Sequence, residues 1–355
     1  MRNRETEAAE PRVAEPPAGF DYELPPERIA QQPAGAREDA RLLCVRRGVA
    51  GALEHARVSE LVDRLSPGDL LVRNRSRVFP ARLHGRREPG GGALEALLLH
   101  AEGDPALWRA MARPMKRLRE GQEVRFGPAG ELAAVVEARS AGSVLLRFAP
   151  DVDVLEAAEA FGEMPLPPYI HRPEGATDED AIRYQTVFAR ERGSVAAPTA
   201  GLHLTESIFA ALRARGVGVA DIVLHVGPAT FLAGQPGRSA LAVEPEVYFV
   251  PPETREAIAA CRGRVVAVGT TTTRALESAA RQDWPAQPRP TDLVLHEGVA
   301  FEVVGGLLTN FHLPGSSLLA LVAGFAGSST ARAAYDAAVR DGYRFYSYGD
   351  AMLVL

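Results

Sequence analysis

One segment, from about Gly85 to Pro150, limits the possible folds of this 355-residue chain more than any other. It holds short apolar runs at roughly ten-residue spacing, separated by turns such as Gly90-Gly91-Gly92 and Gly127-Pro128-Ala129-Gly130. The apolar runs are Leu94–His100, Leu107–Ala112, Glu123–Phe126, Leu132–Ala138 and Val144–Phe148. Short strands with this spacing are typical of a small antiparallel barrel. We therefore predict that residues 85–150 form a β-barrel domain.

The flanking regions alternate between helix and strand patterns. A helix is predicted at Ser207–Arg215 before a strand at Val219–Val226, and a strand at Arg264–Val268 before a helix at Arg274–Arg281. Such alternation is typical of α/β proteins. A chain of this length usually forms about two domains. We expect an α/β body made of residues 19–84 and 151–355, with the smaller antiparallel β-barrel inserted between the two parts.

The composition indicates where in the cell such a protein is expected. Residues 1–18 are rich in Glu, Arg, Ala and Pro and lack the apolar core of a secretory signal, which predicts a disordered tail. The longest apolar run, near Leu318–Phe325, is much shorter than the ~20 residues that span a bilayer. Cys44 and Cys261 lie far apart and fit neither a zinc spacing nor a disulfide framework. We expect a cytoplasmic protein with no membrane span and no metal site; the sequence leaves its oligomeric state open.

Charge gives two candidate anion-binding segments. The formal net charge of −5 argues mildly against a large basic surface, but a local patch is compatible with it. Arg113–Arg119 is a dense basic turn and the best candidate for contact with a polyanion; a solvated face is the alternative. The segment Arg73–Leu83 is also rich in arginine and includes Arg77 and Arg82. It is either a solvated edge strand or a wall facing phosphate or carboxylate.

The segment Ser194–Thr205 has the composition of a binding site. It is almost free of charge, Pro198 and Gly201 indicate a tight turn, and hydroxyl and imidazole groups accompany them. A histidine beside a turn is often only structural, so this segment needs partners elsewhere in the chain.

Further polar groups follow predicted strands. The four threonines Thr270–Thr273 after Gly269 predict a capped helix start, which would leave backbone N–H groups facing the crevice where α/β proteins bind ligands. A plain cap without ligand is the alternative. Near the C-terminus, Asn310 and His312 interrupt apolar segments.

Together these segments resemble the S-adenosylmethionine:tRNA ribosyltransferase-isomerase family of queuosine biosynthesis, in family order and over almost everything after the tail. The segments that carry the resemblance are Phe20–Pro25, Asp39–Leu43, Pro67–Val72, Val78–Leu83, Met164–Ile170, Arg183–Ala189, Val195–His203, Leu224–Gly227, Leu308–Pro314 and Tyr348–Met352.

The resemblance implies a small β-barrel inserted into an α/β body, with S-adenosylmethionine as co-substrate and no metal. In the family, the ribosyl part of S-adenosylmethionine moves onto the aminomethyl group of a 7-deazaguanine base in a tRNA anticodon. It then rearranges to an epoxycyclopentane, and adenine and methionine leave. The tRNA anticodon is thus the expected partner.

That reaction requires particular groups. The sulfonium acidifies the 5′ hydrogens of the ribose, so a base must remove one of them, and an acid must help adenine to leave. Histidine suits both tasks near neutral pH, and His203, His225 and His312 each end an apolar segment beside Gly or Pro, so we expect these three to carry the acid and base roles, with the base among them left open. The expected substrate-binding residues are Arg77, Arg82, Tyr169, Tyr184, Gln185, Pro198, Thr199, Gly201, Gly227, Thr271, Thr272 and Asn310. Tyr169 and Tyr184 are candidates for stacking on adenine or facing the sulfonium.

The chain departs from the family pattern at four motif positions. Arg75 stands where the family has an aspartate, Leu241–Glu246 where it has His-x-Met-His-Ser-Glu, Ala229 where it has a glycine, and Gly315 where it has a lysine. These departures keep two alternatives open beside the family reaction. One is a divergent paralogue that cleaves S-adenosylmethionine or transfers part of it to a small molecule. The other is a non-catalytic binding protein with the same fold.

Overall fold

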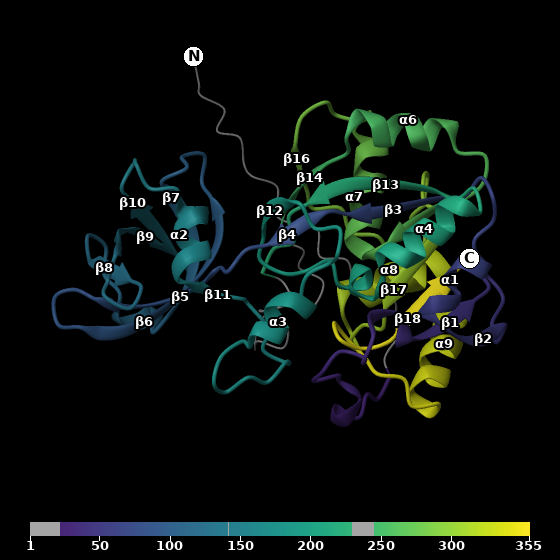
Figure 1. Ribbon diagram of the computed structural model, residues 1–355, viewed down its shortest axis with the longest axis horizontal. Coiled ribbons are helices and arrows are strands. Elements are labelled where there is room, and N and C mark those ends of the chain that lie inside the picture. Colours follow the sequence, from purple (N-terminus) through teal and green to yellow (C-terminus); the bar gives the residue numbers. More distant parts are fainter. Residues whose placement is uncertain (1–21, 141, 229–244) are drawn as a thin grey trace, which may run out of the picture.

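The computed structural model describes residues 22–140, 142–228 and 245–355. Figure 1 shows a barrel of strands on one side and a larger body of sheet and helices on the other. The chain crosses to the barrel after β4 (Ser76–Val78) and returns after β11 (Gly162–Glu163). The predicted tail, residues 1–18, lies outside the described residues.

The body is built on a nine-stranded mixed sheet in the order β16-β14-β13-β3-β15-β17-β18-β1-β2. Its strands are β1 (Arg41–Val45), β2 (Leu53–Arg57), β3 (Leu70–Asn74), β13 (Gly218–Leu224), β14 (Glu246–Phe249), β15 (Val265–Val268), β16 (Arg289–Thr291), β17 (Gly306–Asn310) and β18 (Ala351–Val354). The central strands β13, β3, β15 and β17 are mutually parallel. Their carboxyl ends therefore meet at one edge of the sheet.

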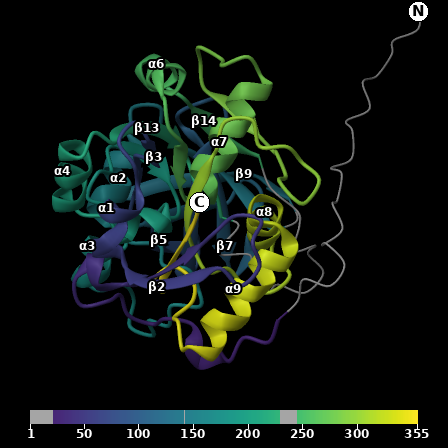
Figure 2. The same ribbon diagram turned by 90° about the vertical axis from the view of Figure 1, so that its right-hand side faces the viewer.

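Alternate residues of the central strands feed two hydrophobic cores, as the period of two in a strand requires. Leu71 and Val266 pack in the core under α4, whereas Val72 and Ala267 pack in the core under α7. The helices are α1 (Leu61–Arg64), α2 (Val154–Phe161), α3 (Asp178–Arg183), α4 (Glu206–Ala214), α6 (Pro252–Ala260), α7 (Gly269–Arg281), α8 (Ser317–Ala326) and α9 (Ser328–Arg340). In Figure 2, α4 lies on one side of the C-terminal strand and α8 and α9 on the other. Helices thus cover both faces of the sheet, which explains why its parallel strands are mostly apolar, while the charged Arg73 of β3 and Asp221 of β13 pair with each other at 2.6 Å.

The predicted antiparallel barrel is confirmed. Its strands are β5 (Arg82–Arg87), β6 (Gly92–Ala101), β7 (Leu107–Arg113), β8 (Glu123–Phe126), β9 (Leu132–Ser140) and β10 (Ser143–Phe148), in the order β5-β6-β7-β10-β9-β8 with β5 pairing β8 to close the barrel. Closure depends on Gly85, where a Cβ atom would lie 2.1 Å from the Arg125 carbonyl oxygen. The barrel strands run from Arg82 to Phe148, whereas the sequence predicts the insert at residues 85–150. The helix α2 follows the last barrel strand and packs against β5 and β11.

The helix after β15 starts earlier than predicted. Gly269, with φ of +88°, is already the first residue of α7, so the four threonines lie in its first turns and do not precede it. The Thr272 and Thr273 hydroxyls donate to the carbonyls of Val268 and Gly269, at 2.7 and 3.1 Å. The prediction of a threonine cap is therefore wrong, because the N-cap residue is Val268, which has no capping side chain. The free backbone N–H groups of the helix start still follow the strand directly.

Short 3-10 helices complete the described chain: η1 (Pro26–Arg28), η2 (Arg37–Asp39), η3 (Val58–Glu60), η4 (Met115–Arg117) and η5 (Thr199–His203). A two-stranded ribbon pairs β4 with β12 (Glu191–Ser194) beside the main sheet. Over the three described ranges, no helix combines the length and apolar character needed to cross a membrane.

Candidate active site

A cavity of about 890 Å³, the first cavity, opens at the edge where the parallel strands end. His225 follows β13 directly, Thr271 lies in the first turn of the helix after β15, and Asn310 is the last residue of β17. All three line the cavity, as does Trp108 of the barrel. The topology thus brings together polar groups that are far apart in the sequence, at the edge where open α/β sheets bind ligands.

Many of the residues predicted from the sequence meet at this cavity. Those lining it are Tyr169, Pro198, Thr199, His225, Gly227, Thr271, Asn310 and His312. His203, Tyr184, Gln185, Gly201, Thr272, Arg77 and Arg82 do not line it.

His203 lies behind Asn310. The Thr199 hydroxyl donates to Asn310 Oδ1 at 3.0 Å, and Asn310 Nδ2 lies 3.1 Å from His203 Nε2. Burial lowers the pKa of His203 to about 4, with smaller effects from Asp350, Arg344 and Arg37. A neutral imidazole accepts the amide hydrogen at Nε2 and so fixes which way the Asn310 amide points. His203 therefore orients a cavity residue and does not line the cavity.

His312 lines the cavity but is held on several sides. Its Nε2 lies 2.9 Å from the Thr309 hydroxyl, its backbone N–H donates to the Tyr335 hydroxyl, and its carbonyl accepts from the Tyr22 hydroxyl. Burial lowers the pKa of His312 to about 3. The side chain is thus neutral and its position is fixed.

His225 is the least constrained of the three histidines. Its ring packs against Gly193, where a Cβ atom would come within 2.8 Å of Nδ1. Nδ1 is buried and has no hydrogen-bond partner among the described residues. Burial lowers the pKa of His225, and the nearby Glu191 carboxylate opposes that shift. His225 therefore lines the cavity with an imidazole whose Nδ1, buried on the Gly193 side, is engaged by no described residue.

The start of α7 forms another wall. Thr270 and Thr271 line the cavity, and the Thr271 hydroxyl oxygen is buried without a hydrogen-bond partner in the described chain. The first N–H groups of a 13-residue helix carry partial positive charge. This wall is suited to a carboxylate or another anionic group.

Sequence reasoning missed a buried ion pair in the same cavity wall. Arg274 donates to the Glu246 carboxylate, which also accepts from the Gly227 N–H at 2.8 Å. Arg274 Nε donates to the Leu293 carbonyl at 3.1 Å, so the pair ties α7, β14 and the Gly227 segment together. The signal in the sequence is an arginine one turn inside a helix that follows a buried strand, where an unpaired charge is costly.

An aromatic pair completes the cavity. The rings of Tyr169 and Tyr346 meet edge to face with centroids 4.1 Å apart, and the Tyr169 hydroxyl hydrogen-bonds to Ser347 Oγ. Tyr346 has φ of +73°, a left-handed conformation that strains a bulky residue. Strain of this kind gathers at functional sites, where the surrounding structure must hold it. Tyr346 and Ser347 are lining residues that the sequence did not single out.

Several predicted residues instead hold the fold. Tyr184 is fully buried against Tyr348, and the Gln185 amide bonds both the N–H and the carbonyl of Val78. At Gly201 a Cβ atom would lie 2.7 Å from the Phe188 ring. Thr272 is occupied with its helix carbonyl, as described above. Arg77 is exposed and lies 3.7 Å from Glu159.

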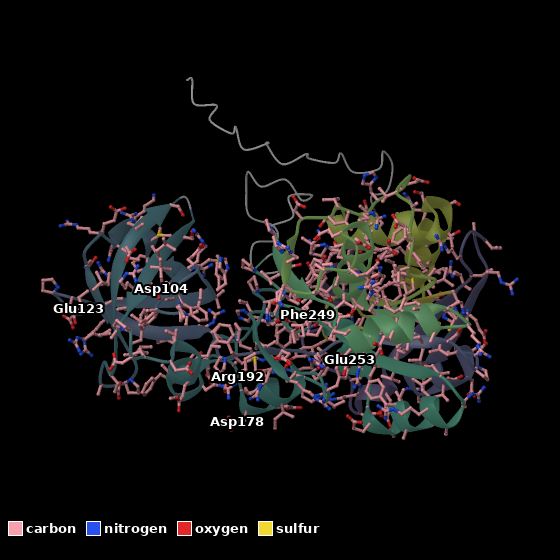
Figure 3. The ribbon with its side chains drawn as sticks, turned by 90° about the horizontal axis from the view of Figure 1, so that it is seen from above. Asp104, Glu123, Asp178, Arg192, Phe249 and Glu253 are labelled. Carbon is pink, nitrogen blue, oxygen red and sulfur yellow. The ribbon has the colours of Figure 1, made fainter. Side chains whose placement is uncertain are left out.

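A second cavity of about 980 Å³ lies between the barrel and the body and shares Leu99, His100, Pro228 and Pro245 with the first. Arg82 lines it and pairs with Glu95 at 2.6 Å. The proline-rich segment Met164–Ile170 serves both cavities, because Tyr169 lines the first and its neighbours the second. Figure 3 shows the two lobes with Asp104 and Glu123 on the barrel and Phe249 and Glu253 on the body.

The charge reversal noted in the sequence lies away from the first cavity. Arg75 pairs with Glu191 at 3.1 Å and lines neither cavity. Gly315, which lacks the family's lysine, has φ of +67° beside the cavity residues Pro314 and Ser316. Ala229 and Leu241–Glu244 lie outside the described residues. Among the residues that are described, no three His, Cys, Asp or Glu side chains are grouped so as to hold a metal ion.

The chain is similar to a well-defined set of proteins. A family model described as "Queuosine biosynthesis protein" matches residues 18–354. The S-adenosylmethionine:tRNA ribosyltransferase-isomerase of Acidiphilium cryptum is 47% identical, over 95% of this chain and 98% of that protein. The protein of the same name from Methylobacterium sp. (strain 4-46) is 48% identical, over 94% and 97%. The crystal structure of the S-adenosylmethionine tRNA ribosyltransferase from Thermotoga maritima is similar with a TM-score of 0.52 and 36% identity, covering 95% of this chain and 99% of that one.

Proposed function

Because the chain belongs to the queuosine biosynthesis family of S-adenosylmethionine:tRNA ribosyltransferase-isomerases, we propose that the first cavity is where this reaction takes place. The protein is a transferase-isomerase that moves the ribosyl part of S-adenosylmethionine onto a 7-aminomethyl-7-deazaguanine base in tRNA and forms epoxyqueuosine. The observation that supports this location is the meeting of His225, His312 and Asn310 with the start of α7. The tRNA anticodon is the proposed acceptor, and the cytoplasm the proposed location.

The cavity walls match the parts of S-adenosylmethionine. The start of α7 with the Thr271 hydroxyl suits the methionyl carboxylate. Tyr169 and Tyr346 offer aromatic surface to adenine or to the sulfonium. Thr199 donates to Asn310, which leaves the Thr199 oxygen as an acceptor and one Asn310 N–H as a donor for ribose hydroxyls.

His225 is the best-placed base. The reaction begins when a base takes a 5′ hydrogen next to the sulfonium as a proton and leaves an ylide. His312 is a poorer candidate, because Thr309 already engages its Nε2 and its burial strongly opposes protonation. His225 is less buried, and no described residue hydrogen-bonds to either of its ring nitrogens, so the nitrogen that is not packed against Gly193 is left for the substrate. Once protonated, it can return the proton to adenine as the bond from adenine to the ribose breaks and adenine takes the electron pair.

The other two hypotheses gain no support from the structure. Identity of 47 and 48% along almost the whole chain with proteins named for the family reaction favours that reaction over a small acceptor or a non-catalytic binder. Arg75, the one reversal of charge, lies outside both cavities, and Glu246 of the altered motif lies in the first cavity with Arg274.

A single assay tests the proposal. The protein is incubated with S-adenosylmethionine, with and without tRNA that carries the aminomethyl precursor base, and released adenine and methionine are quantified. We expect release only with the precursor tRNA. Release without tRNA would support the small-acceptor paralogue, and binding of S-adenosylmethionine without any release would support the non-catalytic protein.

A further inference from the structure

Cationic side chains from three barrel segments converge around the turn that follows β7. The turn itself carries Arg113, Lys116, Arg117 and Arg119, all of which are exposed. Arg87 of β5 donates to the Arg117 carbonyl at 3.3 Å, and Arg139 of β9 donates to the Met115 carbonyl at 3.1 Å. We refer to these six cations as the basic cluster. It is assembled by the fold and is not only a run of charge in the sequence.

The turn is held in one conformation. Leu118, between the exposed cations, is fully buried in the barrel core and its N–H donates to the Met115 carbonyl. The Gln122 side chain accepts from the Arg119 N–H at 3.1 Å and donates to the Glu88 carbonyl at 3.2 Å. The cations are therefore presented from a fixed backbone, which lowers the entropy lost when they bind a partner.

Unlike other barrel arginines, the basic cluster has no side-chain ion pair among the described residues, and the Glu120 carboxylate in the turn accepts from the backbone N–H of Arg139 at 3.2 Å. Arg86 pairs with Glu88 at 2.9 Å, Arg125 with Glu123 at 2.6 Å and Arg147 with Asp104 at 2.8 Å. Within the described ranges, none of the six cluster cations forms an ion pair with a carboxylate. In a chain of net charge −5, six gathered and unpaired cations repel one another unless an anionic partner binds them.

The basic cluster adjoins the second cavity. Arg113 and Met115 line that cavity, which reaches the first cavity through Leu99 and His100. Its apolar wall includes Met111 and Leu166, the basic side chains Arg109 and His171 also line it, and Arg109 pairs with Glu102 at 2.5 Å. The carboxylates that line it, Glu95 and Glu163, lie 2.6 Å from Arg82 and 3.3 Å from His84. An apolar wall with basic neighbours suits unpaired nucleotides, whose bases pack on apolar surface while their phosphates meet cations.

We propose that the basic cluster binds the phosphate backbone of the tRNA substrate while the second cavity holds nucleotides next to the modified base. This inference rests on the proposed function, because it needs the modified base in the first cavity. The continuity of the two cavities favours RNA over an acidic protein or a membrane surface, since the same polyanion must also deliver a base to the first cavity.

The test removes three positive charges from the basic cluster and compares the result with a matched control. Lys116→Gln, Arg117→Gln and Arg119→Gln are combined, which leaves Arg87, Arg139 and the buried Leu118 to hold the turn. The control combines Arg86→Gln, Arg125→Gln and Arg147→Gln, which removes the same charge from paired arginines. Precursor tRNA binding is measured from 50 to 300 mM salt, and KM for tRNA, KM for S-adenosylmethionine and kcat are measured by adenine release.

Each lost phosphate contact lowers the slope of log affinity against log salt by about 0.7 to 0.9. We therefore expect the first variant to lose about two units of slope and to raise KM for tRNA about tenfold or more. KM for S-adenosylmethionine and kcat at saturating tRNA stay unchanged, and the control keeps the wild-type slope. An unchanged slope and KM for tRNA in the first variant would overturn the inference, and so would an equal loss in the control. Turnover of precursor tRNA by the wild-type protein would leave the proposed function intact in either case. A wild-type protein that does not act on precursor tRNA fails the proposed function instead.

Discussion

At the scale of single residues, the histidines differ in what already engages their ring nitrogens. Nε2 of His203 faces Asn310 and Nε2 of His312 faces Thr309, while Nδ1 of His225 has no partner among the described residues. We predict that His225→Gln lowers the kcat of adenine release by about 10²- to 10⁴-fold, the usual contribution of a general base. Affinity for S-adenosylmethionine, measured by calorimetry, changes much less.

His55→Gln is the matched control for that variant. His55 lies on the edge strand β2, where it bonds Tyr343 and lines neither cavity. Its variant should release adenine at close to the wild-type rate. An active His225→Gln enzyme would exclude His225 as the base.

His203 provides a different prediction, because its proposed task is to orient Asn310. His203→Gln retains an acceptor for the Asn310 amide, whereas His203→Leu removes it and leaves a buried donor unpaired. We expect His203→Leu to raise KM for S-adenosylmethionine by about tenfold, and His203→Gln to restore most of that loss. If both variants show equal and large losses of kcat with no change in KM, His203 takes part in the chemistry itself.

At the scale of elements, the first turn of α7 contains neighbouring threonines with different hydrogen bonding. The Thr271 hydroxyl is buried without a partner beside the cavity, and the Thr272 hydroxyl donates to the Val268 carbonyl. Thr271→Val should raise the Kd for S-adenosylmethionine by about three- to tenfold, the value of one hydrogen bond of about 1 kcal/mol. Thr272→Val is the control, because its hydroxyl is bonded inside the helix. Any effect of this variant should appear in the melting temperature and not in the Kd for S-adenosylmethionine. An unaltered Kd in Thr271→Val would remove this hydroxyl from the binding site.

The pairing of Arg274 with Glu246 links elements that are distant in the sequence. Both side chains are buried, and removing one partner of such a pair leaves an uncompensated charge. We predict that Glu246→Gln lowers the free energy of unfolding by about 3 kcal/mol in urea titrations. The double variant Glu246→Leu with Arg274→Met should recover part of this loss, since it leaves no buried charge behind. Equal losses in both variants would mean that packing, and not charge, is decisive.

The sequence predicts those elements whose signals lie within a few neighbouring residues, and it does not predict contacts between distant segments. The barrel strands show in the sequence because alternation and turn residues are local signals, and Leu98 or Val136 must face the barrel core. The start of α7 is not predictable in the same way, since Thr272 and Thr273 can either cap a helix or bond back inside it. The pairing of Glu246 with Arg274 depends on the sheet order, which periodicity does not reveal.

At the scale of the whole molecule, the sheet order decides which predicted site residues meet. His225, Thr271 and Asn310 come from strands that neighbour β3 or each other, so their parallel ends place them at one edge. Tyr184 and Gln185 belong to Arg183–Ala189, another segment that carries the resemblance, yet they hold the fold beside the cavity. Resemblance therefore locates the neighbourhood of a site, and topology separates the residues that face the ligand from those behind them.

The buried histidines also predict how the stability of the whole molecule depends on pH. An unfolded histidine titrates near pH 6.5, while burial lowers the pKa of His203 to about 4 and that of His312 to about 3. Below pH 6.5 the unfolded state thus binds more protons than the folded state. The contribution of these histidines to the free energy of unfolding is therefore fully present above pH 6.5 and is lost progressively as the pH decreases. For two histidines the loss is about 4 kcal/mol between pH 7.5 and pH 5. His225, whose pKa is also lowered, adds to the loss in the same window.

Urea titrations at pH 7.5, 6.5, 5.8 and 5.0 measure this dependence. The buried carboxylates Asp69 and Asp180 have a lowered pKa in the folded state, so their stabilisation is lost only as the pH falls below about 4, the pKa of an unfolded aspartate. The window from pH 6.5 to 5 therefore reports mainly the histidines. The double variant His203→Gln with His312→Gln should show a much flatter dependence there, because neither state then gains protons at these positions. A double variant as steep as the wild type would show that these histidines are not buried in the neutral form.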